Sequence, residues 1–132
     1  MYTFKKEERL CSKKLLEKLF HNGSSFLLYP FRISWLIADE IPDNVPAQVV
    51  ISVSKRRFKR AVDRNTLKRR MREIYRLNKT ELVYSYLEKP ILLSISYVGN
   101  EVADFPFMEK KLKQALFKLK NQYMERYADQ VD

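Results

Sequence analysis

A strict alternation of side chains in the segment YPFRISWLIA, residues 29–38, constrains the fold more strongly than any other feature of the chain. On a strand, one side of this segment carries only apolar side chains, those of Tyr29, Phe31, Ile33, Trp35 and Ile37. Arg32 and Ser34 fall on the opposite, more polar side. Because a strand with one apolar face has to bury that face, we expect Tyr29, Phe31 and Trp35 to lie in a core covered by helices.

Similar patterns divide the rest of the chain into strands and helices. The segments QVVISVS and PILLSISYV each read as a strand, while apolar residues at helical spacing predict three helices. In chain order, the expected elements are a helix at 12–21, strands at 29–38 and 48–54, a helix at 58–77, a strand at 90–98 and a helix at about 105–127. A fourth short strand between residues 40 and 47 is compatible with the pattern. The order α-β-β-(β)-α-β-α predicts an α+β fold, a two-layer α/β sandwich of three helices on a small, mostly antiparallel sheet.

The length and composition favour a single domain over residues 1–132. Hydrophobic residues make up 45% of the chain, which is enough for a real core and excludes a disordered basic tail. No apolar run approaches the roughly 18 residues of a membrane span, and the N-terminal segment MYTFKKEERL lacks the apolar region of a secretory signal. A single cysteine, Cys11, excludes an internal disulfide and a cysteine-rich metal site. We therefore expect a cytoplasmic protein that neither spans nor binds a membrane.

The positive charge of the chain is concentrated in one segment. The net charge is +10, and residues 55–76 alone carry eleven Lys and Arg against two acids, a net charge of +9. Such a block on one element of a balanced domain is typical of a surface that binds a polyanion. A helix face exposed only to solvent is the plain alternative, but such faces usually mix both signs. The preceding segment reads as a strand, which disfavours a helix-turn-helix on DNA and favours a folded RNA.

The predicted helix at 58–77 has an apolar side and a basic side. The residues expected to pack on the sheet recur at helical spacing and are Leu67, Met71, Ile74 and Tyr75. The adjoining flank carries Arg64, Asn65, Lys68, Arg69, Arg72 and Arg76. Arginine suits phosphate because its planar guanidinium group binds two oxygens at once. We expect the acidic Glu73 to pair with a helical neighbour such as Arg69.

The segment ISVSKRRFKRAVDRNTLKRRMREIYR resembles the signature of the bacterial ribonuclease P protein family. That family carries S-V-S-K and then A-V-x-R-N-R-x-K-R-x-x-R-E at the start of its central helix. The matching positions are Ser52, Val53, Ser54, Lys55, Ala61, Val62, Arg64, Asn65, Lys68, Arg69, Arg72 and Glu73. Farther upstream, ERLCSKKLLEKLFHNG supplies Arg9, Leu10, Phe20 and Gly23 in the order of the family.

Three positions depart from the family pattern. Thr66 replaces the third residue of R-N-R, and the neighbouring Arg70 adds a cation that points elsewhere. Leu16 replaces the earlier of two aromatic residues on the first helix, so a stacking role rests on Phe20 alone. The glycine usual before A-V is absent and RRFKR stands there, which implies a different path for this loop.

The resemblance implies the protein subunit of ribonuclease P, the endoribonuclease that removes the 5′ leader of precursor tRNA. In this family the RNA subunit performs the Mg²⁺-dependent hydrolysis, so we expect no catalytic residue, metal ligand or cofactor in this chain. The implied partners are ribonuclease P RNA and precursor tRNA, and we expect a monomeric protein. The family fold also implies a left-handed crossover between parallel strands, although general rules favour the right-handed form.

The resemblance further implies two binding surfaces. The residues expected to bind the RNA subunit are Lys55, Arg56, Arg60, Arg64, Asn65, Lys68, Arg69, Arg72 and Arg76. The residues expected to bind the leader, in a cleft between the first helix and one face of the sheet, are Arg9, Phe20, Arg32, Ser34, Ser52 and Ser54. By spacing alone Phe20 is more simply a core residue, and the resemblance favours a stacked base instead.

Other chemistry is weakly represented in the sequence. His21 is the only histidine and Cys11 has no basic partner nearby in sequence, so neither residue indicates a catalytic site. Asp39, Glu40 and Asp43 can form a cation site, although a solvated acidic loop is the simpler interpretation. A ribosomal or assembly protein that binds RNA without catalysis is the main alternative, and a metal-dependent nuclease acting alone is weaker. The main alternative fits the charge but gives no reason for the spacing of S-V-S-K and R-N.

Overall fold

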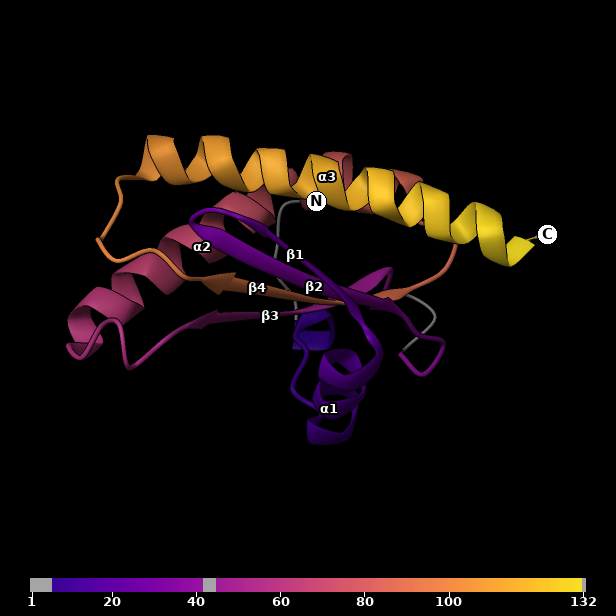
Figure 1. Cartoon of the computed structure of the whole chain (residues 1–132), viewed down its shortest axis with the longest axis horizontal. Coiled ribbons are helices and arrows are strands. Elements are labelled where there is room, and N and C mark those ends of the chain that lie inside the picture. The colour runs from indigo at the N-terminus through magenta and orange to yellow at the C-terminus, as the bar shows by residue number, and fades with distance from the viewer. Residues whose placement is uncertain (1–5, 42–44, 132) are drawn as a thin grey trace.

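The computed structural model describes residues 6–41 and 45–131, with side chains as far as Tyr127 (Figure 1). The elements are η1 (Lys6–Glu8), α1 (Lys13–Asn22), β1 (Ser24–Leu28), β2 (Phe31–Ile37), β3 (Ala47–Val53), α2 (Ala61–Leu82), η2 (Tyr84–Tyr86), β4 (Ile91–Tyr97) and α3 (Phe105–Val131). Three helices and a four-stranded sheet confirm the predicted α+β class. Ser12 caps α1 by accepting from the backbone N–H of Leu15, and Asp104 caps α3 by accepting from that of Phe107.

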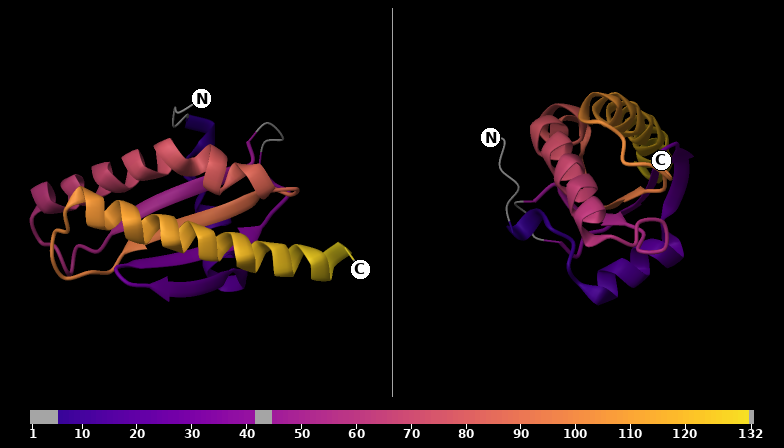
Figure 2. Two further views of the ribbon diagram at one scale, coloured as in Figure 1. Left: turned by 90° about the horizontal axis from the view of Figure 1, so that it is seen from above. Right: turned by 90° about the vertical axis from the view of Figure 1, so that its left-hand side faces the viewer.

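The strands of the sheet lie in the order β1-β2-β4-β3. The pairs β1–β2 and β2–β4 are antiparallel, whereas β3 and β4 are parallel. Parallel neighbours need a crossover connection, and α2 supplies it on one face of the sheet. The views in Figures 1 and 2 show that the path from β3 through α2 to β4 is left-handed, as the family resemblance implied.

The fourth strand is β1 at Ser24–Leu28, so the expected location between residues 40 and 47 is wrong. Of that segment only Ala47 belongs to a strand, β3, while residues 42–44 lie outside the described part of the chain. The sequence SSFLL escaped detection because Phe26 is its only buried side chain, which leaves too short an alternation to recognise. Strand β2 begins at Phe31, and Tyr29 lies in the preceding turn with 55% of its surface exposed. The prediction that Tyr29 belongs to the core is therefore wrong.

Helices cover both faces of the sheet, with α2 and α3 on one side and α1 on the other (Figures 1 and 2). The large core lies under α2 and α3 and includes Phe31, Trp35 and Tyr123. The indole N–H of Trp35 donates to Gln122 Oε1 on α3 at 2.9 Å, which satisfies the buried polar atom. A second, smaller core under α1 consists of Leu10, Leu19, Ala38, Ile41 and Leu92. Because α1 is short, it leaves part of its sheet face open.

Candidate RNA-binding site

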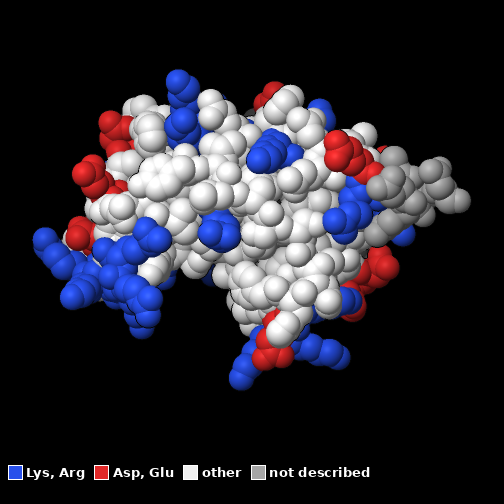
Figure 3. Space-filling view, in the orientation of Figure 1, with Lys and Arg blue, Asp and Glu red and all other residues white. Residues whose placement is uncertain are grey.

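The basic helix is anchored by its apolar side, as predicted. Leu67, Met71, Ile74 and Tyr75 are fully buried against the sheet and α3. The helix runs from Ala61 to Leu82 and is therefore five residues longer at its C-terminal end than the predicted segment. Burial of this side directs the charged flank outward, so the lysines and arginines gather at the surface where α2 begins (Figure 3).

We define the basic surface as the predicted RNA-binding residues of α2 and its preceding loop: Lys55, Arg56, Arg60, Arg64, Asn65, Lys68, Arg69, Arg72 and Arg76. Lys55, Arg56, Arg60, Asn65, Arg69 and Arg72 are exposed, and the other three are half-buried. The structure thus brings all nine residues onto one element and the loop that leads into it. Within the described part of the chain, no helix is both long and apolar enough to cross a membrane.

Internal hydrogen bonds hold several of these side chains in place. Arg64 Nη1 donates to the carbonyl oxygens of Phe58 and Lys59 at 2.7 and 2.9 Å, which ties the loop to the first turns of α2. Phe58 is buried against Tyr97, with ring centroids 5.9 Å apart, so the loop that lacks the family glycine has a hydrophobic anchor instead. Pattern analysis of the sequence missed this role because a single aromatic residue among arginines carries no periodicity.

Glu73 pairs with Arg76 rather than with Arg69, which corrects the expected example. The carboxylate Oε1 lies 2.6 Å from Arg76 Nη2, and this hydrogen bond lowers the pKa of Glu73. Arg70 Nη1 donates to the carbonyl oxygen of Ala103 at 2.5 Å, in the loop before α3. Arg70 therefore points away from the basic surface, as expected, and does not replace the cation missing at Thr66.

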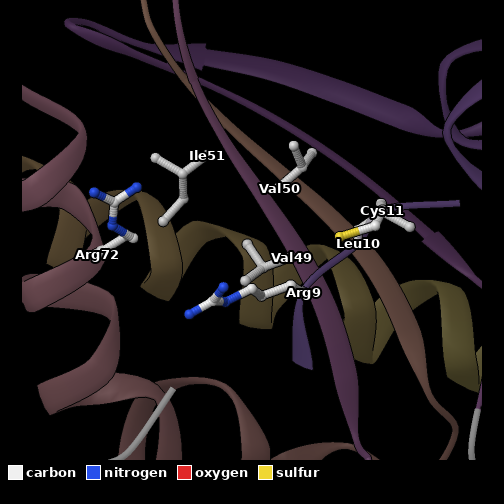
Figure 4. A pocket seen from close by; sticks show the side chains of 7 residues that line it. All are labelled: Arg9, Leu10, Cys11, Val49, Val50, Ile51 and Arg72. Atoms are coloured by element: carbon white, nitrogen blue, oxygen red, sulfur yellow. The ribbon is translucent and has the colours of Figure 1, made fainter. Parts of the chain in front are cut away.

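Arg9 and Arg72, which the sequence assigned to different surfaces, line the same hollow (Figure 4). The hollow has a volume of about 500 Å³ and also touches Cys11 and the strand residues Val49 and Ile51. The backbone N–H of Leu10 donates to the carbonyl oxygen of Val49 at 2.9 Å, which holds the N-terminal segment along β3. The guanidinium groups of Arg72, from α2, and Arg9, from the N-terminal segment, both extend into the space beside β3, a geometry suited to an anion such as phosphate (Figure 4).

The sheet face on the α1 side carries a group of hydroxyls, which we call the serine face. It consists of Ser25, Arg32, Ser34, Ser52, Ser94 and Ser96. Strand pairing places Ser34 between Ser25 and Ser94, and places Ser96 between Arg32 and Ser52. The hydroxyls of Ser52 and Ser96 lie 2.9 Å apart, and Arg32 is exposed. Sequence reasoning missed the three serines of β1 and β4, although Ser94 and Ser96 share the alternation of their strand.

Three predicted leader-binding residues lie outside the serine face, and one of them, Arg9, lines the hollow with Arg72. Ser54 follows the end of β3, where its Oγ accepts from the backbone N–H of Arg56 at 3.1 Å. Phe20 projects from α1 with 61% of its surface exposed, which excludes the alternative that it is a plain core residue. Leu16, one turn earlier, packs against the small core instead. Phe20 is therefore available for a partner outside the chain.

The acidic loop is partly accounted for by an ion pair. Glu40 pairs with Lys18 on α1, and this contact lowers the pKa of Glu40. Asp43 lies outside the described residues. Among the residues that the structure describes, no group of three or more His, Cys, Asp or Glu side chains is arranged to hold a metal ion.

Comparison with known proteins decides the family. The family model described as Ribonuclease P matches residues 4–120 of the chain. The chain belongs to the ribonuclease P protein family. The ribonuclease P protein component of Porphyromonas gingivalis is 33% identical over 120 residues, which cover 89% of this chain and 87% of the relative. That of Petrotoga mobilis is 36% identical over 84 residues, which cover 64% of this chain and 67% of the relative.

Solved ribonuclease P proteins share the fold. The Staphylococcus aureus protein superimposes with a TM-score of 0.66 at 22% identity, covering 86% of this chain and 94% of that structure. The Thermotoga maritima protein gives a TM-score of 0.67 at 23% identity, covering 84% and 96%. As a ribonuclease P protein, the chain is a component of an endoribonuclease that acts in tRNA 5′ processing. Its partners are accordingly ribonuclease P RNA and the tRNA substrate.

Proposed function

We propose that this ribonuclease P protein binds the RNA subunit through the basic surface and the 5′ leader of precursor tRNA through Phe20 and the serine face. The observation that carries the proposal is the hollow shared by Arg9 and Arg72. It lies at the edge of the sheet along β3, between α2 and the N-terminal segment (Figure 4). Two RNA-binding surfaces that meet at one edge can hold two RNA segments near each other.

Docking of the RNA subunit is mainly electrostatic in this proposal. Each phosphate that a lysine or arginine neutralises releases counterions, so about six phosphate contacts give a salt slope of roughly −4 to −5. The exposed arginines of the basic surface supply planar forks that bind phosphate oxygens in pairs. Asn65 adds an amide that both donates and accepts, and it lies among these cations.

Leader binding depends on different chemistry. An exposed aromatic ring such as that of Phe20 stacks a base with about 1–3 kcal/mol. Arg32 and the hydroxyls of Ser52 and Ser96 offer donors to the leader backbone without reading its sequence. Ser54 and Arg9 extend this surface toward the start of α2. The leader is thereby held in extended form across the open part of the sheet.

Hydrolysis takes place on the RNA subunit with Mg²⁺ in this proposal, and the protein binds no cofactor of its own and acts as a monomer. The protein then increases the affinity for precursor tRNA and lowers the Mg²⁺ concentration that the RNA requires. Neither Cys11 nor His21 is needed for the reaction. This division assigns binding to the protein and bond cleavage to the RNA.

The decisive experiment is processing of a precursor tRNA by the ribonuclease P RNA encoded in the same genome. Cleavage is measured at low Mg²⁺ with the RNA alone, with the protein alone and with both. We expect cleavage only with both components, at the junction between leader and mature tRNA. No gain from the protein would refute the proposal, and cleavage by protein freed of RNA would indicate a nuclease that acts alone. Preferential co-purification with ribosomal RNA would instead favour an assembly protein.

A further inference from the structure

A second hollow, which we call the aromatic hollow, lies away from the serine face. It is formed where the turn between β1 and β2 meets the loop before α3, and its volume is about 440 Å³. Its lining residues are Tyr29, Pro30, Tyr97, Asn100, Glu101, Ala103, Asp104 and Phe107. Tyr29 and Phe107 keep 55% and 42% of their surfaces exposed, although both are large aromatic residues. Single exposed rings are ordinary, but these two come from distant segments and line one concave site.

The walls of the aromatic hollow are held rigidly. The backbone N–H of Val98 donates to the carbonyl oxygen of Pro30 at 2.8 Å, which joins the two loops. The Tyr97 hydroxyl donates to the carbonyl oxygen of Glu101 at 2.7 Å. A Cβ at Gly99 would lie only 3.0 Å from Pro30 and from the Tyr97 ring, so glycine permits this close approach. A site with fixed walls loses little conformational entropy when a ligand enters.

Cations surround the aromatic hollow and connect it to α2. Arg57 Nη1 donates to Asn100 Oδ1 at 2.9 Å, and Arg70 Nη1 donates to the Ala103 carbonyl oxygen at 2.5 Å. Lys111 Nζ lies 5.8 Å from the centroid of the Phe107 ring. None of these three cations belongs to the basic surface, yet Arg57 and Arg70 lie within the same charged segment. Arg57 and Arg70 therefore continue the positive charge of this segment from the basic surface to the loop that lines the hollow.

The chemistry inside the hollow suits a base rather than a phosphate. Glu101 and Asp104 contribute carboxylates, which repel an anion but accept hydrogen bonds from the amino groups of a base. Single-stranded RNA is commonly recognised by stacking an unpaired base on aromatic side chains, with its backbone held by cations. The volume also falls within the range of about 300–1,000 Å³ that is usual for small-ligand sites.

We propose that the aromatic hollow binds one unpaired nucleobase of the RNA subunit, stacked on Tyr29 or Phe107, while Arg57 and Lys111 hold the adjacent phosphates. The inference rests on the proposed function, because it takes the RNA subunit as the ligand. It adds an RNA contact at residues that the family signature does not include. An apolar peptide is the competing occupant, and the RNA measurements below separate the two.

The test compares Tyr29→Ala and Phe107→Ala with a matched control, Phe117→Ala. Phe117 lies on the same helix as Phe107 and is 58% exposed, but it does not line the hollow. Binding to the ribonuclease P RNA of the same genome is measured by filter binding over a range of salt concentrations. Loss of one stacked base, worth about 1–3 kcal/mol, weakens binding by about 5- to 150-fold. We expect this loss in at least one of the two variants, an unchanged salt slope, and no loss in the control.

Photocrosslinking gives a second readout that does not depend on the stability of the variants. Wild-type protein is bound to RNA substituted with 4-thiouridine, irradiated and analysed by mass spectrometry. We expect crosslinks to the peptides that contain Tyr29 or Phe107, and their absence overturns the proposal. Binding of both alanine variants as tight as that of Phe117→Ala also overturns it. If wild-type protein shows no salt-dependent binding at all, the proposed function itself fails.

Discussion

Removing one partner of the buried ion pair between Glu8 and Lys79 should destabilise the fold and weaken RNA binding together. Lys79 Nζ lies 2.5 Å from Glu8 Oε2, with side-chain exposures of 2% for the lysine and 12% for the glutamate. The ammonium group also lies 5.6 Å from the centroid of the Tyr84 ring. The pair joins η1 to α2 across 71 positions of the chain. The next residue, Arg9, lines the hollow with Arg72.

The size of the effect depends on which partner is removed. Taking one member away from a buried ion pair costs about 3–5 kcal/mol, because a buried charge is left without its counterion. Glu8→Gln leaves the more deeply buried group, the Lys79 ammonium, and should reach about 3–5 kcal/mol. Lys79→Met keeps the packing of the aliphatic stem and leaves a carboxylate that is closer to water, so its cost should be about 1–3 kcal/mol.

Urea unfolding of both single variants and the double variant measures these costs and the coupling between the two sites. We expect the double variant to be more stable than Glu8→Gln, because it removes the buried charge. Glu73→Gln, which breaks the solvent-accessible pair with Arg76, is the control and should leave the unfolding midpoint nearly unchanged. The reasoning is refuted if the losses in free energy of unfolding of the two single variants add up in the double variant, or if both losses are small and equal. RNA affinity of Lys79→Met should fall, since Arg9 loses its neighbouring anchor.

Three further predictions address binding and pH. Arg64→Ala and Lys68→Ala should each weaken affinity for the RNA subunit and reduce the salt slope by about 1, measured by filter binding, whereas Lys113→Ala on α3 should not. Phe20→Ala should reduce the preference for precursor over mature tRNA by about 5- to 150-fold, measured with both tRNAs, and leave RNA-subunit binding near normal. If Phe20→Ala behaves like the two basic-surface variants, the leader and the RNA subunit do not bind separate surfaces. Burial raises the pKa of Tyr75, so the contribution of Tyr75 to the free energy of unfolding should stay level below about pH 10 and fall above it, where the unfolded tyrosine ionises. Urea unfolding at alkaline pH should show a smaller fall for Tyr75→Phe.

Features that depend on local periodicity could be predicted from the sequence. The alternation of Phe31, Ile33 and Trp35 predicted a strand with one buried face, and all three side chains are buried. The helical spacing of Leu67 and Met71 likewise predicted the packed side of the basic helix. Both patterns give correct predictions because several apolar side chains recur on the same face of one strand or helix.

Features that depend on tertiary contacts could not be predicted. The burial of Lys79 could not be predicted, because a lysine in a helix is normally at the surface unless it is paired. Its partner Glu8 is distant in sequence, so nothing near Lys79 indicated the pair. The convergence of Arg9 and Arg72 depends on the bridge between Arg9 and Val49 along the edge of β3. The candidate surfaces were therefore predicted residue by residue, whereas their meeting point required the structure.

The basic surface is tolerated because the opposite side of α2 is so well packed. Like charges one turn apart destabilise a helix by about 0.2–0.5 kcal/mol per pair. Full burial of a side chain such as Leu67, Met71 or Ile74 contributes about 1.5–3 kcal/mol each, which exceeds the repulsion of several pairs. The helix therefore forms without RNA, and the positive charges of the basic surface remain free to attract RNA phosphates. An RNA-free protein with a preformed α2 should bind without the cost of ordering that helix, which favours rapid, salt-sensitive association.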